Sequence, residues 1–185
     1  MTGRETQGWI AWSSTFRDGG AGEPAYKLYV SPNIAVMPQC LEVVLDVLGR
    51  RAARFKVGAN ASGLLRPDKM VVYFTNQESL LRVASEVGEK LAAVDPHGVP
   101  FSAEITPGGL LSWGMDPPRR TRVLSWHEPE SWRLWVVRRL AAAMVAAQTA
   151  SQADLSPGDF ALERLRHEGV DVETWTPTAH IWQAN

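Results

Sequence analysis

The chain has 185 residues, of which 45% are hydrophobic, so it is long and apolar enough to form one domain around its own core. Its 19 basic and 20 acidic side chains give a net charge of −1, which argues against a general nucleic-acid-binding protein, because such proteins are basic overall. The single cysteine, Cys40, excludes an internal disulfide framework or a cysteine zinc site and indicates a reducing compartment.

The hydrophobic pattern divides the chain into alternating strands and helices. It predicts strands at Trp9–Ser13 (an edge strand), Tyr26–Val30, Ala53–Val57 and Lys69–Thr75, a strand pair at Phe101–Ile105 and Leu110–Trp113, a loop at Ala59–Arg66, and helices at Pro38–Gly49, Gln77–Val94, Pro129–Thr149 and Pro157–Glu168. Asn76 is the expected cap of the helix that begins at Gln77. The tail from Val170 is expected to be irregular.

This order of elements predicts an α+β fold with a single mixed, mainly antiparallel sheet and helices packed on it. We expect one domain over residues 1–185, in which residues 1–24 form an N-terminal segment and residues 129–185 form a helical, tryptophan-rich part. The tryptophans fit either a buried core or a surface that docks a partner.

The polar segment Met1–Gly8 does not resemble a signal peptide, and the longest apolar run, near Leu140–Ala147, is too short to cross a bilayer. We therefore expect a cytoplasmic protein without a membrane partner.

The usual catalytic motifs are missing from the sequence. No two of its four histidines have metal-ligand spacing, and neither HExxH, GxSxG nor GxGxxG occurs, so a metal site is not expected. Cys40 lies on the apolar stripe of a predicted helix, which favours a core residue over a nucleophile.

Basic side chains interrupt the predicted strands in three places. Lys27, Lys56 and Lys69 each lie within or next to an apolar strand, and Arg66 comes shortly before Lys69. One interpretation places these lysines on the wet face of the sheet or on a strand edge, where they discourage aggregation. The other is a basic cluster that binds a phosphate, with Lys27 and Tyr29 on one strand face by the period of two.

Several segments resemble known families. Tyr26-Lys27-Leu28-Tyr29-Val30-Ser31 and Phe55-Lys56 are similar to the blocks that open the lyase domain of class III and IV lanthipeptide synthetases, and Leu65–Tyr73 is similar to a later block of that domain. Phe101–Ile105, Leu111–Pro118 and Asp159–Leu165 resemble the Hop-type A-family of bacterial effectors. Relatives of that fold, phosphothreonine-lyase-like proteins, occur in class V lanthipeptide and thioamitide gene clusters. The resemblance covers roughly residues 25–178.

The resemblance implies a phosphoserine/phosphothreonine lyase. A separate kinase subunit would phosphorylate a ribosomal precursor peptide, and the lyase would remove the phosphate by β-elimination without a metal or organic cofactor. Lys56 aligns with the family's base, so its pKa must fall from about 10.4. Lys27, Arg66 and Lys69 would bind the phosphate of this partner peptide.

Three further residues, Tyr29, Arg119 and Arg120, each allow two interpretations. Tyr29 replaces the family's acid histidine, so it either donates the proton or hydrogen bond itself or marks a lost site. Arg119 and Arg120 either add phosphate contacts or form a solvated loop. A protein without activity would be a binding module that recognises the leader peptide or scaffolds the kinase, and a host-directed effector is a third reading.

Overall fold

The computed structural model describes residues 2–6, 8–13, 26–49, 54–117, 130–149 and 155–178. The chain divides into two compact units, one of residues 1–100 with 104–113 and the other of residues 101–103 with 114–185. No helix in the described part of the chain combines the length and the hydropathy that a bilayer crossing requires.

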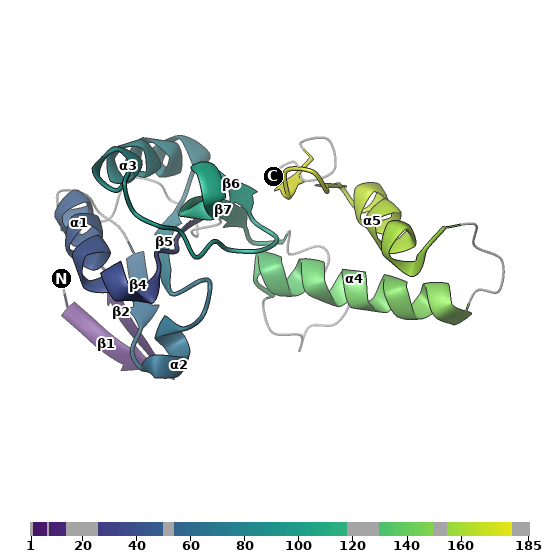
Figure 1. Ribbon diagram of the computed structural model, residues 1–185, viewed down its shortest axis with the longest axis horizontal. Helices are drawn as coiled ribbons and strands as arrows, with labels where there is room; N and C mark the ends of the chain where they lie inside the picture. The colour runs from purple at the N-terminus through teal and green to yellow at the C-terminus, as the bar shows by residue number, and fades with distance from the viewer. Residues whose placement is uncertain are drawn as a thin grey trace. The chain divides into compact units, whose positions relative to one another are not determined.

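The main sheet has seven strands in the order β1-β2-β4-β5-β3-β7-β6, and β1 to β5 lie entirely in the first unit (Figure 1). The strands are β1 (Thr2–Thr6), β2 (Trp9–Ser13), β3 (Tyr26–Val30), β4 (Arg54–Gly58), β5 (Met70–Phe74), β6 (Ala103–Glu104) and β7 (Leu111–Met115). Neighbours from β1 to β3 in this order pair antiparallel. The α+β class and the mainly antiparallel sheet predicted from the sequence are therefore confirmed.

The strand at Trp9–Ser13 has the predicted bounds but not the predicted edge position. It pairs with β1 on one side and with β4 on the other. The polar composition of Thr2–Thr6 concealed β1, because an outer strand needs no apolar pattern to take part in a backbone ladder.

The helices of the first unit are α1 (Met37–Gly49), α2 (Ala61–Leu64) and α3 (Gln77–Lys90). The predicted cap of α3 is confirmed, since the side-chain oxygen of Asn76 accepts a hydrogen bond from the Ser79 amide at 2.8 Å. The segment 59–66, predicted as a loop, contains α2, which follows a second asparagine cap at Asn60. A single turn is too short for a hydrophobic period to reveal.

The core of the first unit lies between one face of the sheet and the helices α1 and α3. Alternating residues of three neighbouring strands join it, and α1 and α3 add their apolar stripes, including Cys40 and Leu80. The strand residues are Leu28, Val30, Phe55, Val57, Met70, Val72 and Phe74. By the same alternation, Lys27, Tyr29, Lys56, Val71 and Tyr73 belong to the opposite face, which we call the site face.

The second unit contains the helices α4 (Trp132–Thr149) and α5 (Pro157–His167) and the short strands β8 (Val170–Asp171) and β9 (Thr176–Pro177), which pair antiparallel. Its core joins Trp132, Trp135 and Val136 of α4 to Leu165 of α5 and to residues of the hairpin. Met144 of α4 is exposed and does not join this core, although it lies at helical spacing from Trp132 and Val136. The tail is not irregular throughout, because it forms this hairpin.

A substitution at Gly58 tests the packing of β4 on α2, because the backbone of Gly58 contacts the backbone of that helix. A Cβ at Gly58 would lie 2.4 Å from the carbonyl carbon of Gly63, and backbone atoms cannot move aside as a flexible side chain can. We expect Gly58→Ala to lower the free energy of unfolding by about 1–3 kcal/mol in urea titrations. Gly49→Ala is the control, since nothing lies within 4 Å of its Cβ position. Equal stability of both variants would contradict the close packing.

Candidate functional site

Three cations surround one aromatic ring on the site face. The antiparallel register places Tyr73 opposite both Lys27 of β3 and Arg54 of β4, and Lys56 lies two residues farther along β4. The Lys27 and Lys56 ammonium nitrogens lie 5.6 and 5.8 Å from the Tyr73 ring centroid, and the Arg54 guanidinium carbon lies 5.9 Å away. We call Lys27, Arg54 and Lys56 with Tyr73 the cation cluster.

Trp9 extends the cation cluster toward the loop before β5. The Lys56 ammonium lies 4.2 Å from the centroid of the Trp9 ring, and the Arg66 guanidinium carbon lies 5.3 Å from the same centroid. Arg66 is also held by two hydrogen bonds to the Asp68 carboxylate, at 2.9 and 3.0 Å. The structure thus brings three of the predicted residues, Lys27, Lys56 and Arg66, around two neighbouring aromatic rings.

Such an arrangement suits an anion with several oxygens. Ammonium and guanidinium groups form charge-assisted hydrogen bonds to phosphate, which are stronger than bonds between neutral groups. The aromatic faces offset part of the repulsion between the cations, because the ring face carries partial negative charge. The cluster is therefore a candidate phosphate site.

Tyr29 shares the site face with Lys27, as the period of two predicted, but it lies in a covered part of that face. Its side chain is 3% exposed and packs in a small apolar cluster with Val71 and Val99. Tyr73, which is half-buried, is the tyrosine at the centre of the cations. The alternation of the strand predicted which face carries Tyr29, but it did not predict that Tyr29 is buried there against Val99.

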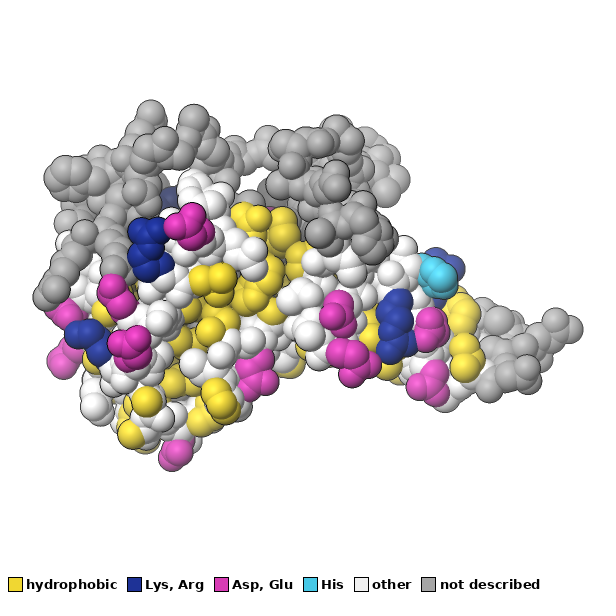
Figure 2. All heavy atoms as spheres, turned by 90° about the horizontal axis from the view of Figure 1, so that it is seen from above, with side chains coloured by type: hydrophobic (Ala, Val, Ile, Leu, Met, Phe, Trp, Pro, Cys, Tyr) yellow, Lys and Arg dark blue, Asp and Glu magenta, His cyan; other side chains and the backbone are white. Residues whose placement is uncertain are grey.

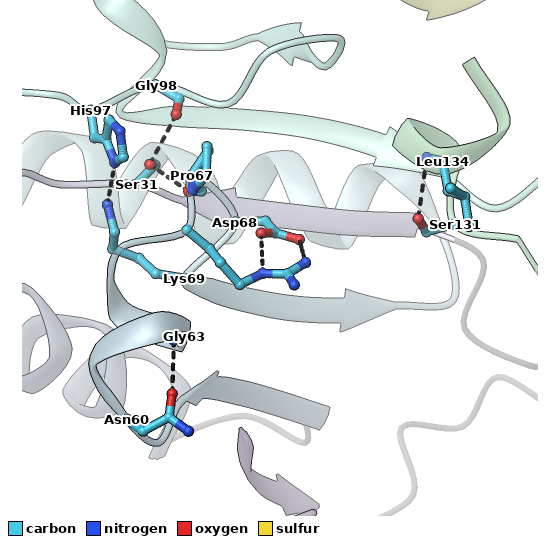
Figure 3. A network of polar contacts seen from close by, with 11 residues as sticks. Ser31, Asn60, Gly63, Pro67, Asp68, Lys69, His97, Gly98, Ser131 and Leu134 are labelled. Carbon is cyan, nitrogen blue, oxygen red and sulfur yellow. Dashed lines mark hydrogen bonds and ion pairs between the residues drawn. The ribbon is translucent and has the colours of Figure 1, made fainter. Parts of the chain in front are cut away.

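Lys69 takes a different place from Lys27 and Arg66. It is 1% exposed, and its ammonium donates a hydrogen bond to the Pro32 carbonyl at 2.9 Å and lies 2.7 Å from Nδ1 of His97 (Figure 3). Burial lowers the pKa of Lys69 from its ordinary value of 10.5, and the nearby Asp68 carboxylate opposes this effect. Its contacts make it a structural tie between loops.

Ser31 supports the same loops beside Lys69. Its hydroxyl oxygen lies 2.6 Å from the Pro67 carbonyl and 3.1 Å from the Gly98 carbonyl (Figure 3). Because Pro67 follows Arg66 directly, these contacts fix the base of the loop that carries the Arg66 guanidinium to Trp9.

Three further candidates from the sequence are Arg119, Arg120 and Cys40. Arg119 and Arg120 lie outside the described residues. Cys40 is fully buried on α1, and burial raises the pKa of its thiol, which suits a core residue and not a nucleophile. On the face seen in Figure 2, basic side chains of the described residues lie beside acidic ones.

Sequence reasoning missed Arg54, Tyr73 and Trp9. Arg54 stands two residues before Lys56, so the period of two could have placed it on the same face of β4. Tyr73 and Trp9 could be placed in the site only with knowledge of the order of the strands. The lysines beside these two rings come from other strands that are distant in sequence, and no local pattern encodes that pairing.

Comparison with known proteins supports the fold. No protein-family model matches the sequence, and none of the curated proteins matches it significantly. Among solved structures, the effector protein from Pseudomonas syringae pv. syringae strain 61 is 15% identical with a TM-score of 0.53, and the effector from P. syringae pv. tomato strain DC3000 is 16% identical with a TM-score of 0.51. In both cases the match covers 92% of this chain and 62% of the effector.

The comparison therefore confirms the effector-like fold that the sequence resemblance predicted. At such low identity the likeness concerns the fold alone, and this chain spans about 62% of the length of those effectors. Neither the lyase reaction nor the link to lanthipeptide enzymes follows from it.

The buried Lys69 predicts a specific pH dependence of stability. A lysine whose pKa is lower in the folded than in the unfolded protein binds fewer protons when folded, so the free energy of unfolding rises with pH between the two pKa values. We expect urea titrations to show this rise as pH approaches 10.5, and Lys69→Met to remove it. Lys90→Met, at an exposed ion pair with Asp46, should retain it. Identical pH profiles for all three proteins would exclude a perturbed Lys69.

Proposed function

We propose that this protein is a phosphoserine/phosphothreonine lyase subunit that acts on a ribosomal precursor peptide phosphorylated by a separate kinase. The observation that supports this function is the cation cluster, in which Lys27, Arg54 and Lys56 meet around Tyr73 on the face of the sheet opposite α1 and α3. The effector-like fold and the sequence resemblance at Lys27 and Phe55-Lys56 point in the same direction.

The reaction is an elimination that needs two kinds of group. A base removes the α-proton of the phosphorylated residue, the electron pair of that C–H bond forms the Cα=Cβ double bond, and the Cβ–O bond breaks with its electrons leaving on the phosphate. Cations stabilise the charge that collects on the leaving phosphate. In this proposal Lys56 is the base, and Lys27, Arg54 and Arg66 bind the phosphate.

The geometry suggests a revised proton donor. A group that protonates or hydrogen-bonds the bridging oxygen must reach the bound phosphate, and Tyr29 is covered by Val71 and Val99. Tyr73 lies between the three cations, so its phenol is better placed for this role than that of Tyr29. Tyr29 then supports the strand beneath the site.

Lys56→Ala tests the proposed base. We expect the wild-type protein to convert a phosphorylated precursor peptide to the dehydrated peptide, as measured by mass spectrometry, and Lys56→Ala to slow this conversion about 10²–10⁴-fold. Lys90→Ala is a matched control, because Lys90 is an exposed lysine paired with Asp46 at 3.1 Å. Phosphate that persists on the peptide with wild-type protein and kinase present would contradict the lyase function.

A second candidate function is a binding module that scaffolds the kinase. The exposed side of α4 favours it, because four large apolar side chains, Leu134, Val137, Met144 and Val145, are solvent-exposed at helical spacing. The opposite side of the helix carries the buried Trp132, Trp135 and Val136. A helix that is apolar on both sides has a surface suited to a protein partner.

Leu134→Ser tests this second function. We expect it to weaken co-purification of the kinase by about tenfold in affinity, since it removes an apolar contact from the interface. Leu81→Ser on α3 is the control, because Leu81 is 45% exposed and Leu134 is 42% exposed. Kinase binding that is equal in the two variants would exclude this side of α4 as the docking surface.

A further inference from the structure

A pocket of about 340 Å³ opens beside the loop that carries Arg66. Its wall combines the apolar residues Ile34, Leu64, Leu65 and Pro96 with Asn33, Lys69 and His97. Ile34 is 43% exposed and Leu65 is 63% exposed, so two large apolar side chains face solvent at this place. This volume is within the range of sites that enclose a ligand group.

One residue of the pocket wall, Lys69, belongs to the same side of the sheet as the cation cluster. The hydrogen-bond ladder between β4 and β5 includes Lys69, the residue directly before β5, because the Gly58 amide donates to the Lys69 carbonyl at 2.9 Å. Lys69 therefore follows the same alternation as Val71 and Tyr73. His97 likewise precedes Val99, which packs on Tyr29 and Val71 of the site face.

The distance between the pocket and the cation cluster suits an extended peptide. Lys69 and Tyr73 are four residues apart on one strand, which corresponds to about 13 Å at about 3.3 Å per residue. An extended peptide rises by about the same amount per residue, so a phosphate at Tyr73 and a side chain in the pocket would be about four residues apart. Leu65 and Arg66, adjacent in the sequence, connect the pocket wall to the cations.

The chemistry of the pocket favours an apolar occupant over an acidic one. The ammonium of Lys69 is already bonded to the Pro32 carbonyl and to His97, and the residue is 1% exposed. A ligand entering the pocket therefore meets the exposed Ile34 and Leu65 before the Lys69 ammonium.

We propose that this pocket is a specificity site for the peptide substrate, which binds one large apolar side chain about four residues from the phosphorylated residue. This inference rests on the proposed function for the phosphate half of the substrate, and it adds a sequence preference that the cation cluster alone does not provide.

Phosphopeptide binding to the full chain tests the proposal. The probes are fluorescent phosphoserine peptides in an alanine-rich background, with a single leucine moved through the positions on both sides of the phosphoserine, and anisotropy gives Kd. We expect leucine about four residues from the phosphoserine, on one side, to tighten binding about tenfold relative to alanine. Leucine at the remaining positions should give less.

Two variants assign the effect to the pocket. Leu65→Ser should bring the ratio of alanine-peptide to leucine-peptide Kd close to one, and Leu81→Ser, an exposed leucine on α3, should leave that ratio as in the wild type. Arg54→Ala should weaken both peptides by the same factor, since it removes a phosphate contact. A leucine preference that survives Leu65→Ser, or no preference at any position, overturns the proposal.

The same peptides without phosphate separate this inference from the proposed function. If wild-type protein binds phosphorylated and unphosphorylated peptides equally, the lyase proposal fails. A leucine preference that depends on Leu65 in the unphosphorylated series then still supports the pocket, and its absence overturns the pocket as well.

Discussion

A buried lysine ties together the segments on which the site depends. The ammonium of Lys69 bonds to the Pro32 carbonyl after β3 and to His97 in the segment after α3. A buried charge without partners costs several kcal/mol, so these two loops must remain close to the start of β5. The Ser31 hydroxyl strengthens the tie through Pro67 and Gly98. Arg66 and the pocket wall lie on the loops fixed in this way.

The two faces of the sheet have separate roles, one in stability and the other in the candidate site. One face is apolar and carries α1 and α3, which provide the burial that stabilises the unit. The other face gathers Lys27, Arg54 and Lys56 around Tyr73, although the chain as a whole has a net charge of −1. Ring faces beside each cation reduce the electrostatic cost of this concentration, by about 0.5–1 kcal/mol per exposed pair.

Local patterns in the sequence predicted much of the fold and part of the site. The strands at Tyr26–Val30 and Met70–Phe74, the Asn76 cap and the shared face of Lys27 and Tyr29 follow from propensity and from the period of two. Trp9 could not be placed, since it reaches Lys56 only because β2 pairs with β4 across more than forty residues of sequence. Strand order is set by packing of the whole sheet, which a local pattern does not contain.

The different positions of the lysines show the limit of an alternation argument most clearly. Lys27, Lys56 and Lys69 follow the same side of the sheet, yet Lys27 and Lys56 are half-buried and Lys69 is fully buried. The difference comes from the segment around His97 and Val99, which contacts Lys69, Tyr29 and Val71. The period of two assigns a side chain to a face of the sheet. Whether another segment packs on that part of the face then decides whether the side chain stabilises the fold or is accessible to a ligand. For that reason Tyr73, and not Tyr29, is the tyrosine that the cations surround.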